Sequence, residues 1–220
     1  GSEMCIRDSV MVGPSSSHTA GAVRIGYISG KLLQDHVVKA EILLHGSFAT
    51  TGIGHGTDKA LIAGLLGMRP DDIRIPDSFF LAKKDGMEFS FSTITLKDAH
   101  PNTAVLRLTG EHGRKIEVQA ASIGGGRILI AKLDGIEVNF SAEKPTLIVH
   151  NVDQPGHVAQ VTSMLAEKQV NIATLQLYRD KRGGYAVMVI ETDQEVPEES
   201  VAWLEQLDGI IKVTYINVEE

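Results

Sequence analysis

The chain has 220 residues, of which 43% are hydrophobic and 22% charged, which suits one or two compact domains, each able to bury a core. Its 21 basic and 28 acidic residues give a net charge of −7, which disfavours binding to a phosphate backbone. Apolar runs such as 187–190 are far shorter than the roughly 20 residues of a membrane span. We therefore expect no nucleic acid and no membrane among the partners.

Cys5 is the only cysteine. One thiol cannot form an internal disulfide, a cysteine-rich zinc site or an iron–sulfur cluster. No secretory pattern opens the chain, so we expect a reducing, cytoplasmic setting. Gly1-Ser2 resembles a tag remnant and 4–8 a translated sequencing adaptor. Residues 1–9 are therefore set aside as an artefact, and Cys5 with them.

A change in charge balance near 141–145 predicts two domains, 10–143 and 144–220. Residues 1–143 carry 15 basic and 16 acidic residues, and residues 144–220 carry 6 and 12. Hydrophobic spacing in the first domain predicts helices and then an antiparallel sheet, an α+β arrangement. We expect helices around 23–33 and 59–66, an ambiguous segment 73–84, and strands at 37–44, 89–96, 104–108, 115–120, 128–133 and 136–140.

The sequence pattern of the second domain predicts the order βαββαβ, which is that of the ferredoxin-like fold. The expected strands are 146–150, 170–177, 185–190 and 210–218, and the expected helices lie around 158–166 and 197–207.

Three consecutive serines, Ser15, Ser16 and Ser17, precede His18 and Thr19 at the start of the first predicted helix. Hydroxyls and free backbone N–H groups at a helix N-terminus can hold a carboxylate or phosphate, and an imidazole titrates near neutral pH. The alternative is an ordinary helix cap beside a surface histidine.

A second loop places His55 between glycines, before Gly56, Thr57 and Asp58 at another helix start. The glycines permit close backbone approach to a ligand, and Thr57 or Asp58 is expected to cap the helix. A plain glycine loop with a solvated histidine is the alternative. Together His18 and His55 form a candidate acid–base pair. The spacing of the histidines indicates no metal site.

In the second domain, Asp153, Pro155 and Gly156 enter a helix. Backbone N–H groups there could take an amino-acid carboxylate, with Asp153 or Asn171 facing its ammonium group. The alternative is a structural strand–helix turn.

These motifs resemble a known family. The segment 13–21, the segments 46–49 and 54–58, the run 100–103 and the run 122–126 resemble, in the same order, the motifs of iron–sulfur L-serine dehydratases of the two-chain form. The chain is similar to their beta chain. Residues 145–220 resemble an ACT domain with 153–156 as its ligand loop, and residues 10–143 resemble the allosteric substrate-binding domain of some phosphoglycerate dehydrogenases.

The resemblance implies deamination of L-serine to pyruvate and ammonia without pyridoxal phosphate. It places a [4Fe–4S] cluster on a partner alpha chain, whose cysteines ligate it, and makes this chain inactive alone. It assigns the substrate carboxylate to Ser15, Ser16, Ser17 and Thr19, with Gly56, Thr57 and Asp58 also at the substrate. His18 and His55 become the acid–base candidates, with His55 the preferred base. Self-association through the ACT domain is expected.

The alternative hypothesis is that the chain is a regulatory subunit that binds and senses serine and performs no chemistry.

Overall fold

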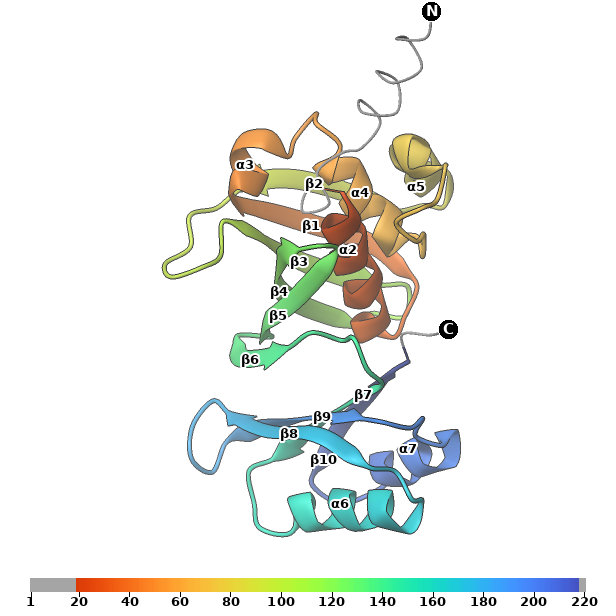
Figure 1. The fold of residues 1–220 in the computed structure, drawn as a ribbon, viewed down its shortest axis with the longest axis vertical. Helices are drawn as coiled ribbons and strands as arrows, with labels where there is room; N and C mark the ends of the chain where they lie inside the picture. Colours follow the sequence, from red (N-terminus) through yellow and green to blue (C-terminus); the bar gives the residue numbers. More distant parts are fainter. Residues whose placement is uncertain (1–18, 218–220) are drawn as a thin grey trace, which may run out of the picture. The chain divides into compact units, whose positions relative to one another are not determined.

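The computed structural model describes residues 19–217, and their internal contacts divide them into two compact units between Leu129 and Ile130. Residues Ser15, Ser16, Ser17 and His18 lie outside the described part. The first sheet has six strands in the order β2-β1-β3-β4-β5-β6 and the second has four in the order β10-β7-β9-β8 (Figure 1). Because β5 spans the division between the units, the domain limit at 143 stays a prediction.

The elements from α2 to β6 confirm the predicted α+β class. Helices and strands alternate in the first part of this stretch, and a run of strands follows. Its helices are α2 (Ala20–Leu33), α3 (Ser47–Thr51), α4 (Thr57–Leu65), the 3-10 turn η1 (Ile75–Asp77) and α5 (Ser78–Lys84). Its strands are β1 (Val37–Gly46), β2 (Glu88–Thr93), β3 (Asn102–Gly110), β4 (Lys115–Gly124), β5 (Arg127–Leu133) and β6 (Ile136–Phe140).

One pairing departs from the expected antiparallel sheet. Strand β2 pairs with β1 in parallel, with Lys39 opposite Glu88. A parallel pair needs a crossover connection, and α3, α4, η1 and α5 supply it. The ambiguous segment 73–84 is therefore helical in its second half. Strand β2 ends at Thr93, earlier than expected, and the Leu96 N–H instead donates to His45 Nδ1 at 3.0 Å.

Helices α2 and α4 pack with their backbones nearly in contact, because each has a glycine at the crossing. A β-carbon on Gly26 would lie 2.2 Å from the Leu61 carbonyl oxygen, and one on Gly64 would lie 2.0 Å from that of Val23. The other buried faces of these helices, including Ile25 and Ile62, form the core of the first unit.

The second sheet confirms the ferredoxin-like order βαββαβ. Its elements are β7 (Thr146–Val152), α6 (His157–Glu167), β8 (Ile172–Arg179), β9 (Tyr185–Thr192), α7 (Glu198–Glu205) and β10 (Ile210–Ile216). Both helices cover the same face of the sheet (Figure 1). The core between them and the sheet includes Val149, Leu165, Ile190 and Leu204, all fully buried. Strand β8 lies at the edge, exposed or half-buried along its whole length.

Candidate functional site

Three of the sequence motifs, the segments 46–49, 100–103 and 122–126, meet at one end of the first sheet, which we call the motif end. Strand β1 ends there, and Gly46 pairs with Asn102 at the start of β3. The Ser47 N–H donates to the Pro101 carbonyl at 2.8 Å. Gly46 has φ +61°, and a β-carbon on it would lie 2.3 Å from that carbonyl oxygen. Only glycine fits at this junction.

Strand β4 and its glycine turn complete the motif end. Thr103 pairs with Ala121, so the antiparallel register brings the next residue, Ser122, beside Asn102. Three glycines with positive φ, at 124–126, then turn the chain into β5. A β-carbon on Gly126 would lie 3.6 Å from the Ala20 methyl group. The first turn of α2 therefore adjoins this turn.

Two buried polar atoms at the motif end have no hydrogen-bond partner among residues 19–217. They are Asn102 Oδ1 and Ser122 Oγ. Ser122 is fully buried. A buried polar group without a partner is uncommon in folded proteins, because its lost hydration is not replaced. Such atoms mark a place where a ligand, a partner chain or another segment completes the structure.

Backbone hydrogen bonds fix the proton position on two nearby imidazoles. The Asn102 N–H donates to His100 Nδ1 at 3.0 Å, and the Leu96 N–H donates to His45 Nδ1 at the same distance. A nitrogen that accepts carries no proton, so in each neutral ring the proton is on Nε2. His100 is exposed, so its Nε2–H is free to donate to a ligand.

The loop that carries His55 follows α3 and leads into α4. His55 is exposed and Gly56, with φ +101°, is the residue that caps α4, without a side-chain hydrogen bond. The expectation that Thr57 or Asp58 caps this helix is therefore wrong. Both residues lie in the first turn and are buried. Asp58 instead braces the loop, since its carboxylate accepts the Gly54 N–H at 3.0 Å.

Thr19 is the cap residue of α2 and makes no side-chain cap hydrogen bond. Its hydroxyl therefore does not satisfy the free N–H groups of the first turn. Roles of Thr19, Gly56, Thr57 and Asp58 in substrate binding stay predictions.

In the loop before α6, the Asp153 carboxylate already has hydrogen-bond partners within the chain. Its carboxylate accepts from the Arg179 guanidinium at 3.2 Å and from the Gly183 N–H at 3.1 Å. The Asp153 N–H donates to the Gly184 carbonyl at 2.8 Å. These contacts tie the loop 153–156 to the β8–β9 turn. Pro155 is exposed, and Gly156, with φ +103°, caps α6.

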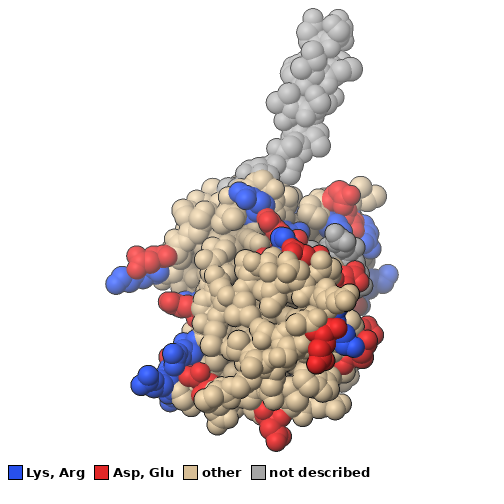
Figure 2. Space-filling view, turned by 60° about the horizontal axis from the view of Figure 1, so that its bottom comes forward, with Lys and Arg blue, Asp and Glu red and all other residues tan. Residues whose placement is uncertain are grey.

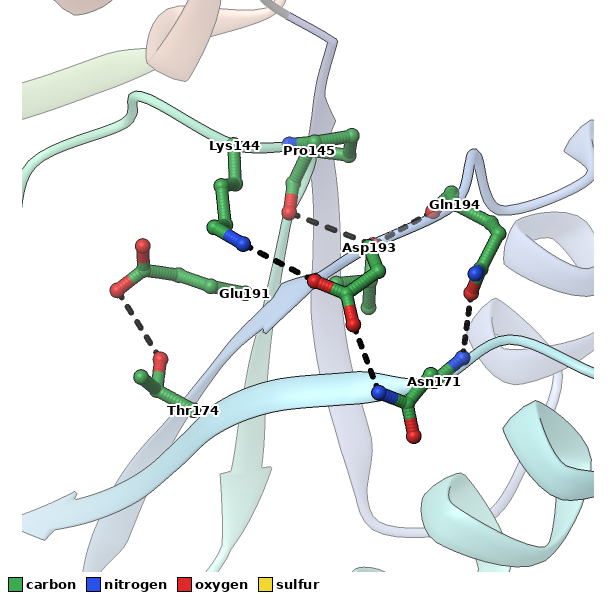
Figure 3. A network of polar contacts seen from close by, with 8 residues as sticks. Lys144, Pro145, Asn171, Thr174, Glu191, Asp193 and Gln194 are labelled. Atoms are coloured by element: carbon green, nitrogen blue, oxygen red, sulfur yellow. Dashed lines mark hydrogen bonds and ion pairs between the residues drawn. The ribbon is translucent and has the colours of Figure 1, made fainter.

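Asn171, at the opposite end of β8, also has hydrogen-bond partners within the chain (Figure 3). Its side-chain amide donates to Asp193 at 2.7 Å, and its backbone N–H donates to Gln194 Oε1 at 2.6 Å. Lys144 adds an ion pair to Asp193 at 3.0 Å. The hydrogen bond from Asn171, and then the one from Lys144, lowers the pKa of Asp193 below its usual value.

The structure does not bring Asp153 and Asn171 together within one chain. Arg179 at the end of β8 contacts Asp153, whereas Asn171 precedes the first residue of β8. A strand of this length spans roughly 25 Å. One amino acid cannot reach both side chains in a single copy, so the two residues cannot share its ammonium group there.

Sequence reasoning did not single out Asn102, Ser122 or His100 as site residues. Their runs were noticed only for their family resemblance. For Asn102 and Ser122 the signal of a functional role is burial without a partner, which depends on cross-strand neighbours. For His100 it is a fixed tautomer, which is set by a hydrogen bond from the backbone two residues along the chain.

Within residues 19–217, no three His, Cys, Asp or Glu side chains are grouped closely enough to bind a metal ion. No helix in the same range is both long and apolar enough to cross a membrane.

Two family profiles match the chain. "Serine dehydratase beta chain" matches residues 8–84, and "ACT domain" matches residues 145–209. The "L-serine dehydratase, beta chain" of Peptoniphilus asaccharolyticus is 36% identical over 210 residues, which cover 95% of each chain. The chain belongs to the serine dehydratase beta-chain family. The "Probable L-serine dehydratase, beta chain" of Bacillus subtilis is 39% identical over 207 residues, or 94% of each chain.

A more distant relative is the "D-3-phosphoglycerate dehydrogenase" of Methanocaldococcus jannaschii. It is 27% identical over 201 residues, which are 90% of this chain but 37% of that enzyme. The region that the two proteins share therefore makes up less than half of the dehydrogenase chain.

Proposed function

We propose that this beta chain supplies one half of the active site of an iron–sulfur L-serine dehydratase, and that the motif end is that half. The observation that supports this most strongly is the full-length similarity to named beta chains. Three of the motifs of the resemblance also meet at the motif end, where Asn102 Oδ1 and Ser122 Oγ are buried without partners among the described residues.

Each polar group at the motif end has a distinct task in this proposal. L-Serine carries a carboxylate, an ammonium group and a hydroxyl. The serine loop 15–17 and the free N–H groups at the start of α2 hold the carboxylate. The Asn102 side-chain oxygen accepts a hydrogen bond from the ammonium group, and the Ser122 hydroxyl orients the same substrate. His100, with its proton on Nε2, donates to a substrate oxygen.

His55 is the proposed base for the α-proton, and His18 is the second acid–base group. An exposed imidazole on a short glycine loop can approach a substrate held at the sheet end. Loss of hydroxide from the β-carbon and of a proton from the α-carbon gives an enamine, which hydrolyses to pyruvate and ammonia.

The proposed cofactor is a [4Fe–4S] cluster held by cysteines of the alpha chain, with no pyridoxal phosphate. The described part of this chain has no suitable group of side chains for it. When bound, the cluster would act as a Lewis acid toward the serine hydroxyl.

For the ACT region we propose self-association. Strand β8 is an edge strand with exposed residues on both faces, and such edges readily pair with another copy. Two copies are also needed before the loop 153–156 and Asn171 can face one ligand.

The proposal is tested by anaerobic co-expression with the cluster-bearing alpha chain and an assay of pyruvate formed from L-serine. We expect turnover by the complex and none by either chain alone. Turnover by the alpha chain without this chain would refute the active-site role. A stable, cluster-loaded complex without turnover would favour the regulatory alternative.

A further inference from the structure

The helix face of the second unit contains a groove that none of the motifs explains. It has a volume of about 630 Å³ and lies between α6 and α7. Cavities that bind small molecules typically measure roughly 300–1,000 Å³. The loop 153–156 contributes nothing to it. Its walls are Ala159, Gln160, Ser163, Met164, Glu167, Lys168, Glu199, Ser200 and Trp203.

Ser200 is the residue of the groove that points to a ligand. It lines the groove, is 2% exposed, and its hydroxyl has no hydrogen-bond partner among the described residues. A buried hydroxyl without a partner is destabilising, because nothing replaces its hydration. A ligand with a hydrogen-bonding group would remove this cost.

The charges on the groove favour a cation. Glu167, the last residue of α6, and Glu199, in the first turn of α7, outnumber the single cation Lys168. The second predicted domain as a whole has 12 acidic and 6 basic residues. An anion would meet net repulsion here, whereas an ammonium group would find two carboxylates and the Ser200 hydroxyl.

The remaining wall suits an apolar body. Trp203 is 46% exposed, although an aromatic ring of its size is usually more deeply buried. Its face can contact a cation or an alkyl chain, and Met164 adds a thioether. The outer side of α6 beside it has no charged residue from His157 to Ala166. Figure 2, in which this helix comes forward, shows an uncharged middle with acidic and basic side chains toward its margins.

We propose that the groove between α6 and α7 binds a small organic ammonium compound with an apolar body. The ammonium group lies against Glu167, Glu199 and Ser200, and the apolar body lies against Met164 and Trp203. L-Serine does not fit this description, because it has no apolar body. The groove is therefore a site for a second molecule, separate from the motif end.

Trp203 is the only tryptophan in the chain, so its fluorescence in the purified full chain reports on the groove alone. The probes are n-hexylamine, which is protonated at pH 7, and its matched neutral and anionic analogues, hexan-1-ol and hexanoate. We expect a saturable fluorescence change with hexylamine and at least about tenfold weaker binding of the other two, as expected for charge-assisted hydrogen bonds.

Two variants test the named contacts. Glu199→Gln removes one carboxylate and is expected to weaken hexylamine binding about tenfold. Glu205→Gln is the matched control, because Glu205 lies on the same helix but outside the groove. Ser200→Ala is expected to weaken binding without lowering the melting temperature.

Three results would overturn the proposal. The first is equal binding of hexylamine and hexanol, which would mean a merely apolar surface. The second is unchanged hexylamine affinity in both Glu199→Gln and Ser200→Ala. The third is a fluorescence change that depends on protein concentration without any probe, which would make the groove a contact between two copies.

Discussion

The motif end and the ACT loop 153–156 both gather polar residues that the family resemblance singles out, yet the polar groups of the two regions are in opposite states. At the motif end, Asn102 Oδ1 and Ser122 Oγ are buried without partners within residues 19–217. In the loop, Asp153 already accepts from Arg179 and Gly183. A buried polar group without a partner is a candidate contact for another molecule or for water, whereas a satisfied group already has a structural role.

Because of this difference, we expect substitutions in the two regions to affect different properties, turnover in one and stability in the other. A substitution at the motif end should lower turnover and leave the fold intact. A substitution at the loop should loosen the β8–β9 turn. The predictions below address this separation, from the largest expected effect to the smallest.

His55→Ala in the alpha–beta complex is expected to lower kcat by roughly 10²–10⁴-fold, the usual contribution of a general base. The residue is exposed, so folding should not suffer. The measurement is steady-state pyruvate formation over a range of L-serine concentrations. His112→Gln, at a surface turn, is the matched control. A shift in the serine dependence with kcat unchanged would instead support the regulatory alternative.

Ser122→Ala is expected to lower kcat/KM at least about tenfold, because a hydrogen bond to a charged substrate is lost. The melting temperature should stay the same or rise, since the variant removes an unpaired buried hydroxyl. Kinetics and thermal unfolding of the same preparation check both parts. A lower melting temperature with unchanged kinetics would show that Ser122 is structural.

Asp153→Asn is expected to lower the unfolding free energy by about 1 kcal/mol, because the ion pair with the half-exposed Arg179 is lost while an amide oxygen still accepts from Gly183. Denaturant unfolding measures this change, with Glu205→Gln as an exposed control. No loss of stability would remove the structural role argued for this carboxylate.

The smallest effect is expected at the other end of the first sheet, where Asp35 pairs with His112 Nδ1 at 2.9 Å. The hydrogen bond to Asp35 raises the pKa of His112 above 6.5, and the one to His112 lowers the pKa of Asp35 below 3.8. The histidine contributes stability below pH 6.5 that is lost as pH rises through its folded pKa. The aspartate contributes stability above pH 3.8 that is lost as pH falls through its folded pKa.

His112→Gln should therefore flatten the decline of stability above pH 6.5 and leave neutral-pH turnover unchanged. Thermal unfolding from pH 5 to 9 provides the measurement. An identical pH profile in the variant and the original chain would refute the pairing.

Hydrophobic spacing was sufficient to predict most helices and strands, because most of them bury one face. It could not reveal α3, which is only five residues long, or the parallel pairing of β2. The motif order predicted the family, now confirmed, but not the contact between Ser47 and Pro101, which depends on the sheet register.

The partners of polar side chains were the least predictable feature. Asp153 is 26 residues from Arg179 in sequence, and Asn171 is 22 residues from Asp193. Nothing in the pattern around either residue indicates that its donor or acceptor is already engaged. A loop rich in polar residues therefore looks the same in sequence whether it awaits a ligand or holds a turn.

The most direct test of this account measures Asn102→Ala and Asp153→Asn side by side in the complex with the alpha chain. Pyruvate formation and the melting temperature are recorded for both. The account predicts that Asn102→Ala loses turnover and keeps its melting temperature, whereas Asp153→Asn melts earlier. Full turnover by Asn102→Ala in a stable complex would contradict the assignment of the active-site half to the motif end.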